Sequence, residues 1–263
     1  MVKELIARIS KGAIMDQIYI PKNRQHGFEI GSYVVIEPTL KKKDVAPSYY
    51  NTGKIAPVKS NIIMELFRHV TDAENVIITG SFLEDGFRFD DLDIIIINGS
   101  CPSLEKFTRD NFGLNVHAIK ISYATLREGM NTDPLFQMML DRFVAKEKVL
   151  FKVRPHINYK LLDLHLLKSK QLIDNFDLLT GQEKYKVLRN VVAIRYFIDG
   201  KKITNKAVDN TIERDFGNGF ITNLRANILE KGTFIKKYKQ LYENTFNQIM
   251  EGIQHGTKQV EAR

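Results

Sequence analysis

The sequence contains a single cysteine, Cys101, and no long apolar segment. One cysteine excludes a disulfide bond within the chain and is typical of the reducing cytoplasm. No stretch approaches the ~20 apolar residues that cross a membrane, and residues 1–12 lack the apolar core of a secretory signal. We therefore expect a cytoplasmic protein that has no membrane partner.

Acidic residues are also in the minority. The chain has 31 Asp and Glu against 39 Lys and Arg, so its formal net charge is +8. A positive field attracts polyanions, which favours nucleic acids and nucleoside triphosphates as partners. A generic lysine-rich surface has the same composition, so charge alone leaves both interpretations open.

Patterning divides the chain into three segments. Residues 1–45 consist of short β-rich runs separated by turn residues. Residues 156–263 carry apolar stripes of helical period throughout. Between them, apolar strands alternate with helical stretches, with strands expected at 76–78, 92–97, 116–121 and 149–153 and helices at 61–70, 104–111 and 136–144. The sequence thus predicts an α+β protein: a small β N-terminal module (1–45), an α/β domain with a mixed sheet (57–155) and a helical C-terminal domain (156–263).

The first chemically informative feature is a glycine at the end of an apolar strand. Gly80-Ser81 follows the strand expected at 76–78. A glycine there allows a tight turn and a close approach to a ligand, because it has no Cβ. The backbone amides that follow can face phosphate oxygens, and Ser81 adds a hydroxyl donor. This turn therefore predicts a phosphate-binding site.

The second feature is an acidic pair at the start of the next apolar strand. Asp91 and Asp93 are two residues apart, so their carboxylates point to one face of the strand. Carboxylates on one face suit Mg²⁺, or Mn²⁺, and two such ions ~3.5–4 Å apart can bind both an attacking hydroxyl and a leaving pyrophosphate. The alternative is structural: Asp91 belongs to a capping loop, and Asp93 pairs with a lysine or arginine.

Together, the glycine turn and the acidic pair resemble the signature of the DNA polymerase β-like nucleotidyltransferase superfamily, over residues 57–155. The resemblance implies a nucleotidyltransferase fold and a catalytic domain that transfers a nucleoside monophosphate from an NTP to an acceptor hydroxyl. Gly80 and Ser81 would bind the triphosphate, while Asp91 and Asp93 would bind the metal ions. Arg88, in the intervening loop, would contact phosphate as a bidentate donor, unless it is a solvated loop charge.

The sequence departs from that family at the next long strand, where most active members have a third carboxylate. Residues 114–121 place Asn115 and His117 on one face and contain neither Asp nor Glu. His117 could act as a general base or metal ligand, or simply line the site. Glu105 or Asp110 could supply the carboxylate instead. The alternatives are a weak enzyme, an unusual acceptor, or a nucleotide-binding relic.

The N-terminal segment resembles a second family. Ile20-Pro21-Lys22, Gly31 and the run at 34–36 are similar to the AbrB-like swapped hairpin, although residues 23–28 are more polar than in that family. The resemblance implies a homodimer formed by exchanged hairpins. It also implies DNA binding through basic residues that contact phosphates, namely Arg8, Lys11, Lys22 and Arg24. The alternative is a β module for dimerisation or acceptor docking.

Two functions follow. The first is a Mg²⁺-dependent nucleotidyltransferase whose acceptor (tRNA or another RNA, a protein side chain, or a small molecule) the sequence does not name. The second is a DNA-binding regulator, or a toxin–antitoxin component, with a degenerate nucleotidyltransferase domain. Helical domains in this superfamily commonly grip the base or the acceptor. The basic residues that would flank the cleft, or else form a solvated face, are Lys184, Lys186, Arg189 and Arg195.

Overall fold

The computed structural model describes residues 9–10, 17–18, 20, 22, 28–34, 46–87, 89, 91–149 and 153–261, without the side chains of 9–10 and 255–261. Contacts divide the chain into two units, Met1–Lys43 and Asp44–Arg263. In the first unit, β1 (Ile9–Ser10) and β2 (Gln17–Ile18) pair antiparallel. Tyr33 and Val34 are exposed and lie outside any strand.

The second unit contains a five-stranded mixed sheet, which confirms the α+β class. In sheet order the strands are β3 (Ser48–Tyr50), β7 (Phe143–Ala145), β4 (Ala73–Thr79), β5 (Asp91–Gly99) and β6 (Asn115–Ile121). β5 and β6 run parallel, and the other neighbours pair antiparallel. β4 and β5 are the central apolar strands that the sequence predicts.

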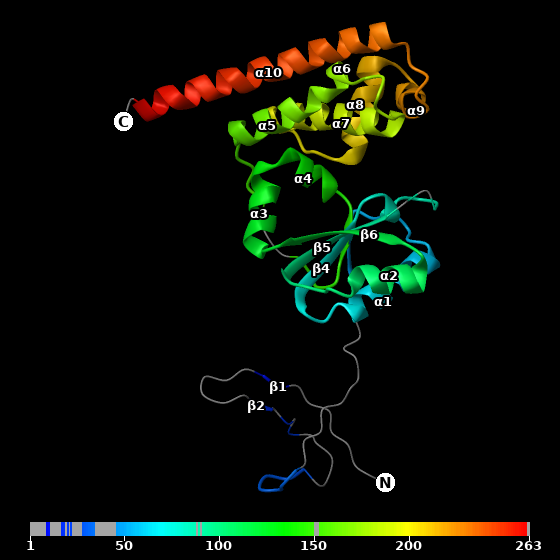
Figure 1. The fold of residues 1–263 in the computed structure, drawn as a ribbon. Coiled ribbons are helices and arrows are strands. Elements are labelled where there is room, and N and C mark those ends of the chain that lie inside the picture. The colour runs from blue at the N-terminus through cyan, green and yellow to red at the C-terminus, as the bar shows by residue number, and fades with distance from the viewer. Residues whose placement is uncertain are drawn as a thin grey trace. The chain divides into compact units, whose positions relative to one another are not determined.

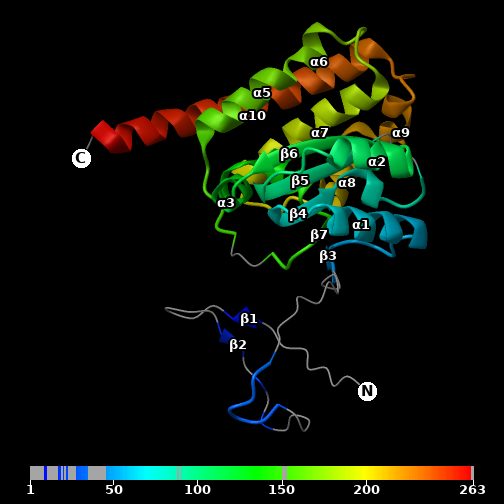
Figure 2. The same ribbon diagram turned by 60° about the horizontal axis from the view of Figure 1, so that its bottom comes forward.

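Helices cover both faces of this sheet (Figures 1 and 2). One face carries α1 (Pro57–His69) and α2 (Leu104–Phe112), and the other carries α3 (Tyr123–Thr132) and α4 (Pro134–Met139). β5 is apolar throughout its centre because alternate residues enter different cores. Ile94 and Ile96 pack in the core with α1, whereas Ile95 and Ile97 pack in the core with α3. Asp91 and Asp93 therefore lie on the face of the sheet that carries α3 and α4.

The prediction of a helix at 136–144 is wrong for the second half of that range. α4 ends at Met139, and Phe143–Ala145 form β7 between β3 and β4. A short apolar run does not distinguish a buried strand from a buried helix by its period alone. The buried Thr79 hydroxyl lies 2.5 Å from the Met139 carbonyl oxygen and 2.9 Å from that of Arg142, which holds this turn against β4.

Other boundaries also differ from expectation. α1 begins at Pro57 rather than near residue 61, because proline is well suited to the first position of a helix. Val149 and Val153 are not in a strand, and residues 150–152 lie outside the described residues. β3 falls in a stretch whose prolines and glycine suggest turns.

The remainder of the unit is a helical layer beyond α4 (Figure 1), comprising α5 (Tyr159–Ser169), α6 (Gln171–Asp174), α7 (Gly181–Ile198), α8 (Asn205–Phe216), α9 (Phe220–Arg225) and α10 (Lys231–Glu261). α7 lies at its centre and begins with a capping box between Thr180 and Glu183. None of the described helices has the length and apolar character needed to cross a membrane. The domain boundary near residue 155 stays a prediction.

Candidate functional site

An open cleft of about 1040 Å³ lies between the sheet and the helical layer. Five of the sequence-predicted residues that line it are Gly80, Ser81, Asp91, Asp93 and His117. They come from three neighbouring segments, namely the turn after β4, the start of β5 and the middle of β6. The structure therefore brings the glycine turn, the acidic pair and the histidine into one cavity. Arg88 lies outside the described residues.

Gly80 is in direct contact with Asp93 of the acidic pair. It directly follows Thr79, whose register partner on the antiparallel strand β5 is Asp93. A Cβ built on Gly80 would lie 2.1 Å from Asp93 Oδ2, and its φ of 81° is in the region that favours glycine. Only glycine therefore fits between the strand end and the carboxylate. The 3₁₀ turn η1 (Ser81–Leu83) follows at once, and Ser81 is half-buried at the cleft.

Asp91 and Asp93 are half-buried and flank Leu92, which is completely buried in the opposite core. This alternation fixes both carboxylates on the cleft side of β5. Asp93 Oδ1 lies 3.3 Å from Nδ1 of His117, its register partner on the parallel strand β6. The His117 side chain is 67% exposed, so one ring nitrogen contacts Asp93 while the ring remains accessible from the cleft.

Neither of the alternative sources of a third carboxylate joins this pair. Glu105 and Asp110 are exposed on α2, and neither lines the cleft. Within the described part of the chain, no three or more His, Cys, Asp or Glu side chains form a group that could hold a metal ion. This donor set does not make an all-protein cage. It does fit Mg²⁺, which proteins often bind through one or two carboxylates together with substrate phosphates and water.

Basic side chains form the opposite wall of the cleft. Lys186 and Arg189 of α7, Arg225 of α9 and Arg142 of the turn after α4 all line it. Lys186 and Arg189 are three residues apart and share one helix face. Arg142 and Arg225 could not be predicted from the sequence, because no local pattern links them to the glycine turn.

The two other basic residues expected at the cleft lie elsewhere. Lys184 is 3% exposed; its ammonium donates to Asn227 Oδ1 at 2.6 Å and lies 3.7 Å from the centre of the Phe176 ring. Burial lowers the pKa of Lys184, against the opposing charge of Asp177. Arg195 does not line the cleft. Lys184 is thus a structural residue of the helical core.

Tyr185 connects the basic residues of this wall. Its hydroxyl donates to Asp209 Oδ1 at 2.7 Å, and the Arg225 guanidinium lies 4.0 Å from the ring centroid. Arg189 Nε lies 3.2 Å from the same carboxylate oxygen, in ion-pair contact but outside hydrogen-bond geometry. Arg189 also donates to Asn205 Oδ1. Burial raises the pKa of Tyr185 to about 12, so its phenol is neutral at physiological pH.

The turn of residues 139–142 joins the two walls. Thr79 binds it from the sheet side, as described above. On the other side, Asp141 Oδ2 accepts a hydrogen bond of 2.8 Å from the backbone amide of Asn205, at the start of α8. A short chain of hydrogen bonds thus runs from the strand that ends at Gly80 to the helices that carry the basic side chains.

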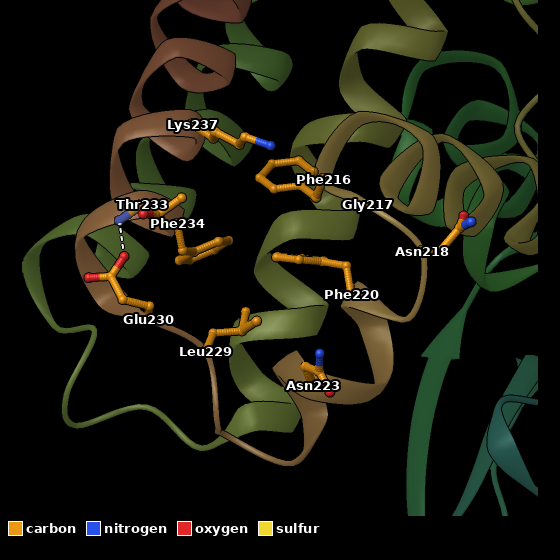
Figure 3. A pocket seen from close by; sticks show the side chains of 10 residues that line it. All are labelled: Phe216, Gly217, Asn218, Phe220, Asn223, Leu229, Glu230, Thr233, Phe234 and Lys237. Carbon is orange, nitrogen blue, oxygen red and sulfur yellow. Dashed lines mark hydrogen bonds between the residues drawn. The ribbon is translucent and has the colours of Figure 1, made fainter.

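A second hollow, of about 310 Å³, lies within the helical layer (Figure 3). The rings of Phe216, Phe220 and Phe234 come together there from α8, α9 and α10, with centroids 4.7–6.0 Å apart. Glu230, at its edge, accepts hydrogen bonds from the amides of Gly232 and Thr233 at the start of α10. This hollow is mainly apolar, and its polar groups are not arranged around a common point (Figure 3). The cleft is therefore the candidate functional site.

Of the basic residues expected to bind DNA in the N-terminal segment, Lys22 is exposed in a turn. Arg8, Lys11 and Arg24 lie outside the described residues. DNA binding and dimerisation by this segment therefore stay predictions.

A comparison of the chain with protein-family models finds no match, and no curated protein matches it either.

Proposed function

We propose that the protein is a nucleotidyltransferase of the DNA polymerase β-like type, which transfers a nucleoside monophosphate from an NTP to an acceptor hydroxyl. One observation carries this proposal: the Asp93 carboxylate lies against the Gly80 turn, in a cleft whose opposite wall is basic. A phosphate-binding turn, a carboxylate pair and guanidinium donors in one cavity match the needs of a metal-bound triphosphate.

The triphosphate would lie between the two walls. Backbone amides after Gly80 and the Ser81 hydroxyl would donate to phosphate oxygens, as at other tight glycine turns. Lys186 and Arg225 would neutralise the remaining negative charge from the helical side, and Arg142 would do so from the turn that joins the two walls. Magnesium ions held by Asp91 and Asp93 together with the phosphates would polarise the reacting phosphoryl group.

In the proposed reaction, the acceptor oxygen attacks the α-phosphorus of the NTP. The new P–O bond forms as the bond to the β-phosphate bridging oxygen breaks, and pyrophosphate leaves. The proton of the acceptor hydroxyl passes to a base. His117 is the candidate base, because its ring lies beside Asp93 and is accessible from the cleft. It lies on the strand that corresponds in the proposed resemblance to the one where most active members of that superfamily carry a third carboxylate.

The direct test is NTP binding and NMP incorporation by the full-length chain in the presence of Mg²⁺. Asp91→Asn and Asp93→Asn should abolish metal-dependent binding of the triphosphate, since each removes a charged oxygen ligand. Asp110→Asn is the matched control, because Asp110 is exposed on α2 and does not line the cleft. Failure of the unaltered protein to bind any of the four NTPs with Mg²⁺ would overturn the proposal.

The second candidate is a DNA-binding regulator built on a degenerate transferase domain. The observation that favours it is the absence of a three-carboxylate group from the described residues. It predicts a salt-dependent shift of duplex DNA that is lost when Arg8, Lys11, Lys22 and Arg24 are changed together. Absence of binding at low salt would exclude it.

A further inference from the structure

Lys59 is a buried lysine for which the proposed reaction gives no direct role. It lies in the first turns of α1 and is 2% exposed. Burying a charged ammonium is costly unless other groups compensate for the lost water. The contacts of Lys59 therefore indicate what this charge stabilises.

Those contacts all involve one short segment. The Lys59 ammonium donates to the Glu84 carbonyl oxygen at 2.6 Å. It lies 5.5 Å from the ring centre of Phe82, 5.4 Å from that of Phe87 and 5.1 Å from that of Phe89. Such distances allow attraction between a cation and the negative faces of aromatic rings. We call Lys59 and these three phenylalanines the Lys59 cluster.

Electrostatics around the ammonium are consistent with this arrangement. Burial lowers the pKa of Lys59, and the carboxylates of Asp85 and Glu84 act in the opposite direction. Two carboxylates that line the cleft therefore act on a buried cation that does not line it. The Phe82 and Phe89 rings also contact each other edge to face, with centroids 5.0 Å apart.

The position of the segment gives the cluster its significance. Residues 84–90 connect the Gly80–Ser81 turn to Asp91 and Asp93, and from Glu84 to Phe89 the described residues form neither helix nor strand. Glu84, Asp85 and Phe89 nevertheless line the cleft. Because the described residues of this segment lie outside any strand or helix, side-chain contacts help to hold them, and Lys59 supplies one hydrogen bond and two ring contacts there, with a third ring contact at Phe82.

We propose that Lys59 is a positioning residue of the nucleotide site: it holds Glu84, Phe87 and Phe89, so that the phosphate-binding turn and the acidic pair keep their spacing before the NTP arrives. This rests on the proposed function. Lys59 does not line the cleft and acts through Glu84 and the phenylalanines. Its removal should therefore lower the affinity for MgNTP, because the free protein then has to order this segment on binding.

The experiment compares variants of the full-length chain by calorimetric titration with MgATP, MgGTP, MgCTP and MgUTP and by hydrogen exchange of peptides that cover residues 82–93. Lys59→Met keeps the length and apolar stem of the side chain but removes the cation and the donor. We expect faster exchange in this segment and an affinity lowered about tenfold, as is common for residues that orient a ligand's direct contacts. Lys59→Arg keeps both features and should restore most of the affinity.

Phe87→Ala provides a test that does not depend on the folding of a core variant. Phe87 is 64% exposed, so truncation removes one ring of the cluster at little cost to the core. This substitution should also raise the rate of hydrogen exchange in peptides that cover residues 82–93 and weaken MgNTP binding. Phe246→Ala, at a partly exposed phenylalanine of α10, is the matched control and should bind as the unaltered protein does.

The outcomes separate this proposal from the one on which it rests. Unchanged MgNTP affinity in both Lys59→Met and Phe87→Ala, with clear binding by the unaltered chain, would overturn the role of Lys59 and leave the proposed function standing. No MgNTP binding by the unaltered chain would overturn both. If Lys59→Met does not fold, the comparison of Phe87→Ala with Phe246→Ala decides.

Discussion

Gly80 and Asp93 are in contact across the β4–β5 pair, with the carboxylate of Asp93 occupying the space that a side chain at position 80 would need. This contact defines the shape of the candidate site, because it brings an acidic oxygen next to a backbone turn with a positive φ. It also makes position 80 sensitive to the smallest substitution.

Gly80→Ala should therefore impair both folding and binding. The added methyl overlaps Asp93 Oδ2 and the backbone is strained, so we expect a loss of about 1–3 kcal/mol in the free energy of unfolding. MgNTP affinity should fall at least about tenfold, because Asp93 has to move. Urea unfolding and calorimetric titration measure the two effects.

Gly113→Ala is the control for backbone strain. Gly113 has a φ of 68° and no atoms within 4 Å of an added Cβ. It should lose about 1 kcal/mol of stability and keep its MgNTP affinity. Equal affinities for Gly80→Ala and Gly113→Ala would contradict the assignment of the turn.

His117→Gln tests the proposed base. Glutamine keeps a polar side chain beside Asp93 but does not accept a proton at neutral pH. We expect the rate of NMP transfer to fall about 10²- to 10⁴-fold with little change in MgNTP affinity. Asn115→Ala, at the register partner of Asp91, is the comparison on the same strand face. A transfer rate that survives His117→Gln would show that another group accepts the proton.

Tyr185 should contribute to stability at neutral pH and lose that contribution in alkali. Its pKa is raised from an ordinary value of 10 to about 12, first by burial. A raised pKa means that the folded state favours the neutral phenol. The contribution, up to about 2 kcal/mol, is complete below pH 10 and disappears as the pH rises to 12.

Tyr185→Phe should consequently be less stable than the unaltered protein at pH 8 and more nearly equal to it at pH 12. Chemical unfolding at several pH values gives the comparison. Burial also raises the pKa of Tyr238, which serves as an unchanged background in both proteins. A stability difference that is constant with pH would contradict the shift at Tyr185.

The ionised carboxylate of Asp133 should stabilise the folded protein at neutral pH and lose this effect in acid. Its Oδ1 accepts hydrogen bonds from the amides of Leu135 and Phe136 and so caps α4, while Oδ2 lies 3.1 Å from His165 Nε2 of α5. Burial raises the pKa of Asp133, but the contact with His165 and the two amides outweigh it and the pKa is lowered. The contribution is therefore present above the unfolded-state pKa and is lost as pH falls through the folded-state pKa.

Asp133→Asn keeps the cap and removes the charge, so it should cost about 1 kcal/mol at pH 7 and flatten the acid side of the stability curve. Asp133→Ala should cost about 1 kcal/mol more, because the cap is lost too. Thermal melting between pH 2 and 7 distinguishes the two. Parallel pH curves for all three proteins would contradict the role of the carboxylate charge.

Much of the sheet side of the site could be predicted from the sequence. The residue alternation of a strand places Asp91 and Asp93 on one face, and the glycine after an apolar run marks the turn. His117 was found because it occupies the middle of the next apolar run. Local sequence patterns are enough to predict these residues, since the position of each side chain is set by the strand that carries it or precedes it.

The helical wall could not be predicted in the same way. Arg142 and Arg225 reach the cleft through packing between segments that are distant in sequence, while Lys184, next to Tyr185 on the same helix, points into the core. A charge pattern does not show which helix face meets the sheet. β7 was missed for a related reason: three residues become a strand because β3 and β4 lie on either side of them.

The turn of residues 139–142 has a consequence for how the cleft opens. It is hydrogen-bonded to β4 through Thr79 and to α8 through Asn205, so the sheet and the helical layer are anchored to each other at this edge. We expect any widening of the cavity to pivot about this anchor, with the largest excursion at the far rim. The geometry around residue 80 would then stay almost unchanged as the cavity widens.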